Sequence, residues 1–67
     1  MYTQAEALKE IRAIAKKNGL TFKKMNKKSD GVCLWMFTNR KTGQKILENC
    51  RFWTAYADCQ SGYLETL

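Results

Sequence analysis

Sixty-seven residues permit one small domain, and 45% hydrophobic content with eight aromatic side chains is typical of a folded chain. Twelve lysines and arginines against six acidic residues give a net charge of +6, which favours an anionic partner such as nucleic acid. The chain has no histidine, the commonest general base and metal ligand, so we expect no enzyme activity and no metal or cofactor site.

The three cysteines are an odd number and widely spaced: Cys33, Cys50 and Cys59. This set is too small for a disulfide scaffold and cannot complete a four-ligand zinc site. The N-terminus lacks the pattern of a signal peptide, and the longest apolar run is far shorter than a membrane span. We therefore expect a cytoplasmic protein with no membrane partner.

The first predicted element is a helix at about 3–18. Thr3 and Glu6 fit a capping box, in which the Thr3 hydroxyl accepts from the Glu6 N–H and the Glu6 carboxylate reaches back to the Thr3 N–H. Asn18-Gly19 supplies a left-handed stop. Between them, small and aliphatic side chains recur at helical spacing as one stripe: Ala7, Leu8, Ile11, Ile14 and Ala15.

A first strand is predicted at about 20–25. Lys23-Lys24 interrupts its apolar residues, as is typical of an edge strand that discourages pairing with other chains. Residues 26–31, with the sequence Asn-Lys-Lys-Ser-Asp-Gly, have turn composition and are expected to form a linker.

The second predicted strand, at about 31–38, contains the longest apolar run of the chain. Its β-favouring residues and the turn residues on either side favour a strand over a helix, which is the competing interpretation. A strand that is apolar throughout lies in the middle of a sheet. Its alternate residues form two sets, Val32, Leu34, Met36 and Cys33, Trp35, Phe37. One of these sets should face the helices. The other set is covered by the tail, covered by a partner or left exposed.

Residues 39–44 predict a hairpin with a type I turn followed by a left-handed Gly43. A third strand follows at about 44–48. If Arg40 faces Gln44, the same register pairs two residues of the second strand with the third: Phe37 with Leu47, and Thr38 with Ile46.

A second helix is predicted at about 50–61, with Asn49 as its cap and Ser61-Gly62 as its stop. Cys50 is interpreted as a packing residue, and the alternative is a thiol whose pKa is lowered by the start of this helix. The expected apolar face consists of Phe52, Ala55, Tyr56, Cys59 and Tyr63. Cys33 and Cys59 are interpreted as small core residues.

These elements predict an α+β fold for a single domain of residues 1–67. The short connections favour a three-stranded antiparallel meander with residues 31–38 in the centre. Both helices are expected on one face of this sheet, which gives a two-layer α-β-β-β-α arrangement.

The basic residues are the strongest functional signal. One interpretation is that these positive charges contact phosphates. The alternative is that they form a solvated face that keeps the protein in solution. The end of the first helix and the 26–31 linker can meet at one rim of the sheet. The 39–44 hairpin lies at the other end of the central strand. The candidate residues for an anionic partner are Lys16, Lys17, Lys23, Lys24, Lys27, Lys28, Arg40 and Lys41.

The aromatic candidates for base stacking or for anchoring an interface are Trp35, Trp53, Tyr2 and Tyr63. Trp53 lies off the apolar stripe of its helix and is the better interface candidate. Trp35, in the apolar run, is interpreted first as a packing residue.

The order of elements resembles double-stranded RNA-binding domains in topology. Members of that family carry a Gly-Pro-x-His-type loop and a lysine cluster at the second helix, whereas this chain has Arg40-Lys41-Thr42-Gly43 and Asn49-Cys50-Arg51-Phe52 there. The Asn39–Gly43 hairpin and the Ala55-Tyr56…Ser61-Gly62-Tyr63 ending also look like short αβββα proteins of phages and prophages, anti-CRISPR proteins among them. This resemblance implies action by occupancy, in a bacterial host cell.

The leading hypothesis is a small, basic, non-enzymatic binding module, a phage-type accessory protein. It engages nucleic acid, or a nucleic-acid-handling host defence complex, through a lysine-rich surface, and duplex binding should weaken steeply with salt. One alternative is a protein–protein inhibitor of a host enzyme that uses an exposed aromatic sheet face. Another is a structural homodimer that closes this face with a second copy.

Overall fold

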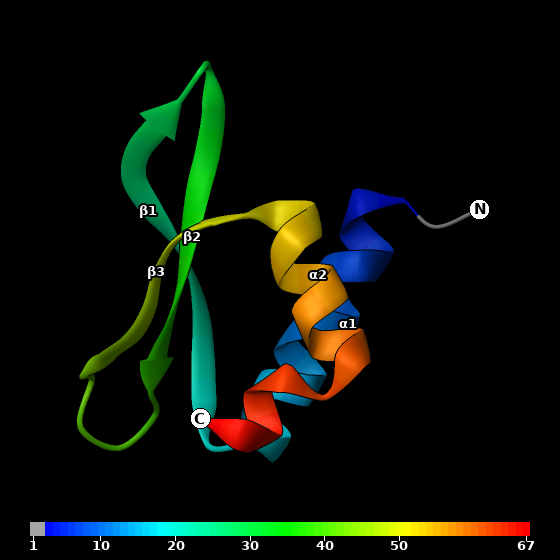
Figure 1. Ribbon diagram of the computed structural model, residues 1–67, viewed down its shortest axis with the longest axis vertical. Helices are drawn as coiled ribbons and strands as arrows, with labels where there is room; N and C mark the ends of the chain where they lie inside the picture. The colour runs from blue at the N-terminus through cyan, green and yellow to red at the C-terminus, as the bar shows by residue number, and fades with distance from the viewer. Residues whose placement is uncertain (1–2) are drawn as a thin grey trace.

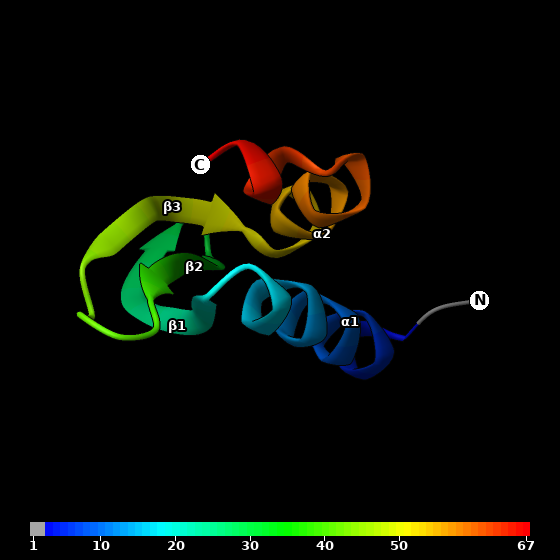
Figure 2. The ribbon, with the colours of Figure 1, turned by 90° about the horizontal axis from the view of Figure 1, so that it is seen from below.

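The computed structural model describes residues 3–67, which form three antiparallel strands and two helices. The strand order is β1-β2-β3, and both helices lie on one face of the sheet (Figure 2). The predicted α+β meander with the apolar run at its centre is confirmed. The elements in chain order (Figure 1) are α1 Gln4–Lys17, β1 Leu20–Ser29, β2 Val32–Asn39, β3 Lys45–Arg51, α2 Phe52–Ser61 and a short 3-10 helix, η1, Tyr63–Thr66.

The capping residue of α1 is Thr3, as predicted. Its hydroxyl oxygen accepts from the Glu6 N–H at 3.2 Å and donates to the Glu6 carboxylate at 3.2 Å. The carboxylate therefore pairs with the Thr3 hydroxyl, instead of the Thr3 N–H that a full capping box requires. The helix ends at Lys17 with Asn18 as its C-cap, and Gly19 follows with a left-handed φ of +71°. The predicted stripe faces the sheet, with Ala7, Ile11 and Ala15 fully buried.

Strand β1 is longer than predicted, because residues 26–29 continue the ladder instead of forming a linker. The connection to β2 is only Asp30-Gly31, and both residues have positive φ, +52° and +77°. A two-residue turn with two left-handed positions matches the right-handed twist of paired strands, and Asp-Gly is a typical sequence for it. This hairpin projects beyond the ends of both helices (Figure 1).

A bulge interrupts the pairing of β1 with β2. Lys24 pairs with Trp35 and Lys28 pairs with Cys33, so three residues of β1 lie opposite Leu34 alone. Bulges of this kind bend a strand and increase its twist. The end of β1 that carries Lys27 and Lys28 is consequently redirected relative to its start.

The register of β2 with β3 was predicted correctly at Phe37, which pairs with Leu47. The predicted pair of Thr38 with Ile46 is wrong, because Thr38 pairs with Lys45. At the tip the Asn39 N–H donates to the Gln44 carbonyl at 2.7 Å, so Asn39 faces Gln44 in place of the predicted Arg40.

The cause of this shift is the Asn39 side chain. Its Oδ1 accepts from the backbone N–H groups of Lys41 at 2.9 Å and Thr42 at 3.1 Å, so the loop closes one residue earlier than predicted. Gly43 is left-handed, as predicted, with φ of +76°.

Asn49 does not cap α2, contrary to the prediction. It lies inside β3 with φ of +57°, at an irregularity where β3 has one more residue than β2 between Cys50 and Leu47. Helix α2 begins directly after β3, with Arg51 as a cap that makes no side-chain bond. It ends at the left-handed Gly62, as predicted.

Aromatic rings fill the layer between the sheet and the helices. Phe22 stacks on Trp35 with ring centroids 4.7 Å apart and planes at 4°, and the fully buried Phe37 lies 4.8 Å from Phe22. Tyr63, expected on the apolar face of α2, lies instead in η1 with 44% of its surface exposed. The next residue, Leu64, takes the place in the core, where η1 packs against α2.

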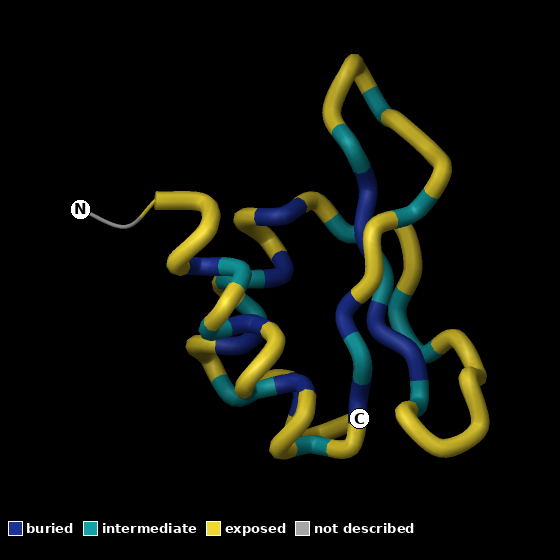
Figure 3. Tube along the Cα trace, turned by 180° about the vertical axis from the view of Figure 1, so that it is seen from behind, coloured by how far each residue is buried: buried dark blue, intermediate teal, exposed yellow. Residues whose placement is uncertain are grey.

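The sheet face away from the helices carries no aromatic residue of β2, because Trp35 and Phe37 point toward the helices. Leu34 and Thr38 are nevertheless buried, with 7% and 4% of their surfaces exposed. The two outer strands meet over β2, where Met25 Sδ accepts from the Asn49 N–H at 3.3 Å. The exposed aromatic sheet face, one of the alternatives considered from the sequence, is therefore absent. Both hairpin tips are exposed, as are the outer sides of the helices (Figure 3).

Candidate functional site

The basic residues divide between two ends of the molecule. At one end the Arg40 N–H donates to the Gly19 carbonyl at 2.9 Å, which brings the β2–β3 tip against the end of α1. We call Lys16, Lys17, Arg40 and Lys41 the basic end. The lysines of α1 therefore do not share a rim with the 26–31 segment, as the sequence had allowed, because that segment lies at the opposite end of the sheet (Figure 1).

At that opposite end, three lysines gather along the bulged part of β1. Lys24, Lys27 and Lys28 line one depression together with the half-buried Cys33. Lys24 and Lys28 pair with alternate residues of β2 and so share the face of Trp35 and the helices. Lys23 pairs with Met36 and points to the other face, as strand alternation predicts.

A second depression adjoins the first, since Cys33 lines both. It is a hollow of about 560 Å³ between the β1–β2 turn and the starts of α1 and α2. Val32, Arg51 and Trp53 line it, and Trp35 contributes to its wall. An apolar hollow therefore lies next to the hairpin lysines.

Trp53 is the most exposed tryptophan of the described chain, with 52% of its surface in contact with solvent. Two rings of α2 meet it nearly at right angles: Phe52 at 5.1 Å and 89°, and Tyr56 at 5.7 Å and 80°. Val32, also at the hollow, is 43% exposed. The placement of Trp53 suits an interface residue, whereas Trp35, 8% exposed and stacked on Phe22, is a packing residue. Of the two tyrosine candidates, Tyr63 is exposed in η1, and Tyr2 lies outside the described residues.

Few of these positive charges are neutralised. Among residues 3–67 only two ion pairs occur, Lys45 with Glu48 at 3.2 Å and Arg51 with Asp30 at 3.5 Å. The three hairpin lysines belong to neither pair. We define the hairpin site as Lys24, Lys27, Lys28 and Arg51 together with Val32 and Trp53.

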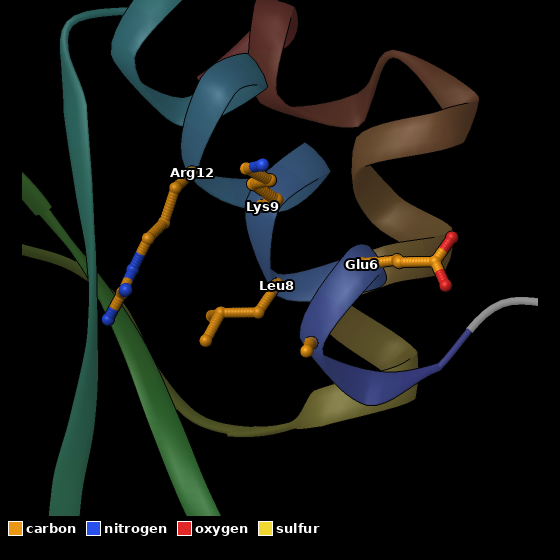
Figure 4. Close-up of a pocket in the computed structure, with 5 residues that line it drawn as sticks. Glu6, Leu8, Lys9 and Arg12 are labelled. Carbon is orange, nitrogen blue, oxygen red and sulfur yellow. The ribbon is translucent and has the colours of Figure 1, made fainter.

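Another shallow depression, of about 390 Å³, follows the outer surface of α1. Figure 4 shows Leu8 and Arg12 pointing toward the β1 side of the helix, whereas Glu6 points away from it. Its charged side chains have both signs and do not converge on one point. This surface offers no defined set of groups for a ligand.

Neither Cys50 nor Cys59 is an activated nucleophile. Burial, and then the Asp58 carboxylate, raises the pKa of the Cys59 thiol to about 11, and the same two causes raise the pKa of Cys50. Cys50 lies in β3 opposite Trp35, ahead of α2, and its raised pKa contradicts the alternative of a thiol whose pKa is lowered by the start of this helix. Both thiols are protonated at neutral pH, and a protonated thiol is a poor nucleophile.

Sequence reasoning missed Val32 and Arg51 as members of the hairpin site. The signal that was available is the Asp30-Gly31 dipeptide, because a two-residue turn at this point extends both strands to their full length. The extended hairpin then places Val32 near the start of α2. The juxtaposition with Trp53 itself has no local sequence signal.

Comparison with known proteins gives no family model, curated protein or solved structure that matches the chain. In residues 3–67 no helix combines the length and the apolar composition that crossing a membrane requires. No three side chains of the acidic and cysteine residues in this part of the chain form a group able to hold a metal ion.

Proposed function

We propose that this chain is a non-enzymatic nucleic-acid-binding module that makes its main contact through the hairpin site. The observation that supports this proposal is the presence of three lysines without ion-pair partners beside a half-exposed tryptophan on one continuous surface. A solvated face needs charges alone, and a protein interface favours apolar residues without uncompensated lysines. Lysines combined with an accessible aromatic ring are typical of surfaces that bind nucleic acid.

Each part of the hairpin site has a separate physical role in this proposal. Lys24, Lys27 and Lys28 approach phosphates and release counterions, which supplies affinity without sequence preference. Trp53 and Val32 offer apolar surface to a base or sugar. The basic end contributes a long-range attraction that speeds the encounter. Such a protein acts by occupying its target, as the phage-type accessory proteins that the sequence resembles are expected to do.

The proposal is tested by comparing two double variants that remove the same charge from opposite ends of the molecule. In K27A/K28A the affinity for a labelled oligonucleotide at low salt should fall at least about tenfold. The slope of log K against log salt should become shallower by about 1.5, because two phosphate contacts are lost. The matched control K16A/K17A should retain most of the affinity. Fluorescence anisotropy over a salt series measures both quantities.

Two results would contradict the proposal. If the wild-type chain binds neither single-stranded nor duplex oligonucleotides at low salt, direct binding of nucleic acid is wrong. If K16A/K17A loses more affinity than K27A/K28A, the contact lies at the basic end and the assignment to the hairpin site is wrong.

A further inference from the structure

We infer that the hairpin site selects unpaired nucleic acid, with one base stacked on the Trp53 indole in the hollow and the neighbouring phosphates on the lysines of β1. This inference rests on the proposed function and narrows its ligand to a single strand. Positive charge alone led us to expect binding to a duplex. The preference for a single strand depends instead on how the apolar side chains of the site are placed.

The first observation is how Trp53 is held. The edge-on contacts with Phe52 and Tyr56 fix the indole, while 52% of the residue remains accessible. A fixed aromatic ring costs little conformational entropy on binding and provides a stacking platform. Bases in a duplex present only their edges, so a platform of this kind is useful only to an unpaired base.

The second observation is the hollow beside the ring. Val32 and Trp35 line it together with Trp53, and its volume of about 560 Å³ lies within the range of small-ligand sites. The half-exposed Val32 and Trp53 both line it, and they offer apolar surface to an unpaired base. The rigid backbone of a duplex cannot insert a base into such a hollow without unpairing it.

The third observation is the arrangement of charge around the hollow. Arg51 lines it and makes one contact, with Asp30 at 3.5 Å, so most of its five N–H donors remain for a phosphate. Lys24 and Lys28 lie on the face of the sheet that carries Trp35, which lines the hollow, whereas Arg51 pairs with Leu34 and approaches the hollow from the other face. A strand that places one base on Trp53 can therefore extend its backbone toward Lys28 and Lys24, whose positive charge complements the phosphates.

The experiment compares three labelled ligands of equal phosphate number per strand: an oligothymidine, the same strand with abasic residues, and an oligothymidine–oligoadenine duplex. The wild-type chain should bind the oligothymidine about tenfold more tightly than the abasic strand, because stacking of one base on an aromatic ring raises the affinity by about this factor. In W53A this preference should disappear, while affinity for the abasic strand stays unchanged. Y63A is the matched control, because Tyr63 is 44% exposed but lies in η1, away from the site.

A second readout uses the intrinsic fluorescence of tryptophan. Oligothymidine should quench the wild-type emission, and W53F, which retains only the buried Trp35, should show almost no quenching. Unchanged emission of Trp35 in W53F also confirms that the core is intact.

Equal affinity for oligothymidine, abasic strand and duplex would overturn the stacking inference and leave the proposed function standing. A preference for the base-containing strand that survives in W53A would also overturn it. Failure of all three ligands to bind at low salt would instead contradict the proposed function itself, so the two failures are distinguishable.

Discussion

Among residues 3–67, two residues other than glycine have left-handed backbone conformations, Asp30 and Asn49. Short polar side chains tolerate this region better than other residues, and each of these two residues serves a different purpose here. Asp30 permits the two-residue turn of the hairpin, and Asn49 permits the bulge of β3. Asn49 was predicted as a helix cap because asparagine is favoured at both kinds of position, and a local pattern does not distinguish them.

A prediction at the residue scale concerns Cys59, which is 5% exposed. Its thiol pKa is raised to about 11 by burial and by the Asp58 carboxylate, so the folded state holds the proton more tightly than the unfolded state. Its contribution to stability is complete below about pH 9 and is lost as the pH rises toward about 11. Urea denaturation of C59A should therefore show a shallower fall in stability over this range than the wild-type chain.

This comparison is internally controlled, because every ionisable group other than Cys59 is present in both proteins. The constant cost of removing the sulfur shifts the whole curve of C59A and leaves its slope unaffected. Parallel curves for the two proteins would contradict the raised pKa of Cys59.

At the scale of elements, the β1–β2 hairpin is the feature that brings the functional residues together. Its turn requires positive φ at two positions, and its bulge lets three residues of β1 pass Leu34. The bulge and the turn set the direction and length of the arm that carries Lys27 and Lys28. Stability of the turn is therefore a condition for the hairpin site.

Gly31 provides the test at this scale, because a Cβ added there would meet no atom within 4 Å. Any cost of G31A then comes from its φ of +77° and not from a clash. We expect G31A to lower the free energy of unfolding by about 1–2 kcal/mol, and G31N by less, since asparagine enters this region more readily. Equal losses in urea denaturation would show that the turn does not require the left-handed conformation.

At the scale of the whole molecule, the closure of the second sheet face changes what is expected of assembly. Leu34 and Thr38 are buried within one chain, and contact between β1 and β3 over β2 covers the centre of this face. The reason for a dimer that hides an aromatic sheet face is therefore removed. The like charges at both ends of the molecule also oppose self-association.

We accordingly expect a monomer at high protein concentration in sedimentation velocity experiments at moderate salt. A dimer that dissociates in V32K would contradict this expectation and would place the exposed Val32 in a contact between copies. Raising the salt concentration distinguishes charge repulsion from the lack of an apolar contact surface as the reason for a monomer, because salt screens the repulsion and leaves apolar contacts intact.

Local pattern by itself determined much of the architecture. The stripe and the caps of α1, the central position of β2 and the left-handed Gly43 all depend on interactions between residues close in the chain. The exposure of Trp53 also followed from its place off the apolar stripe of α2. These features were predictable because helical spacing, strand alternation and turn preferences act over a few residues.

Only the tertiary structure decided which charges share a surface. The hydrogen bond from Arg40 to Gly19 and the bulge in β1 assign the lysines to two opposite ends, and the contact of Met25 with Asn49 closes the second face. These are contacts between distant segments, and their geometry depends on twist, bulges and register, in which a change of one residue reverses a face. Composition therefore indicated an anionic partner, whereas the place where lysines meet an accessible tryptophan required the folded chain.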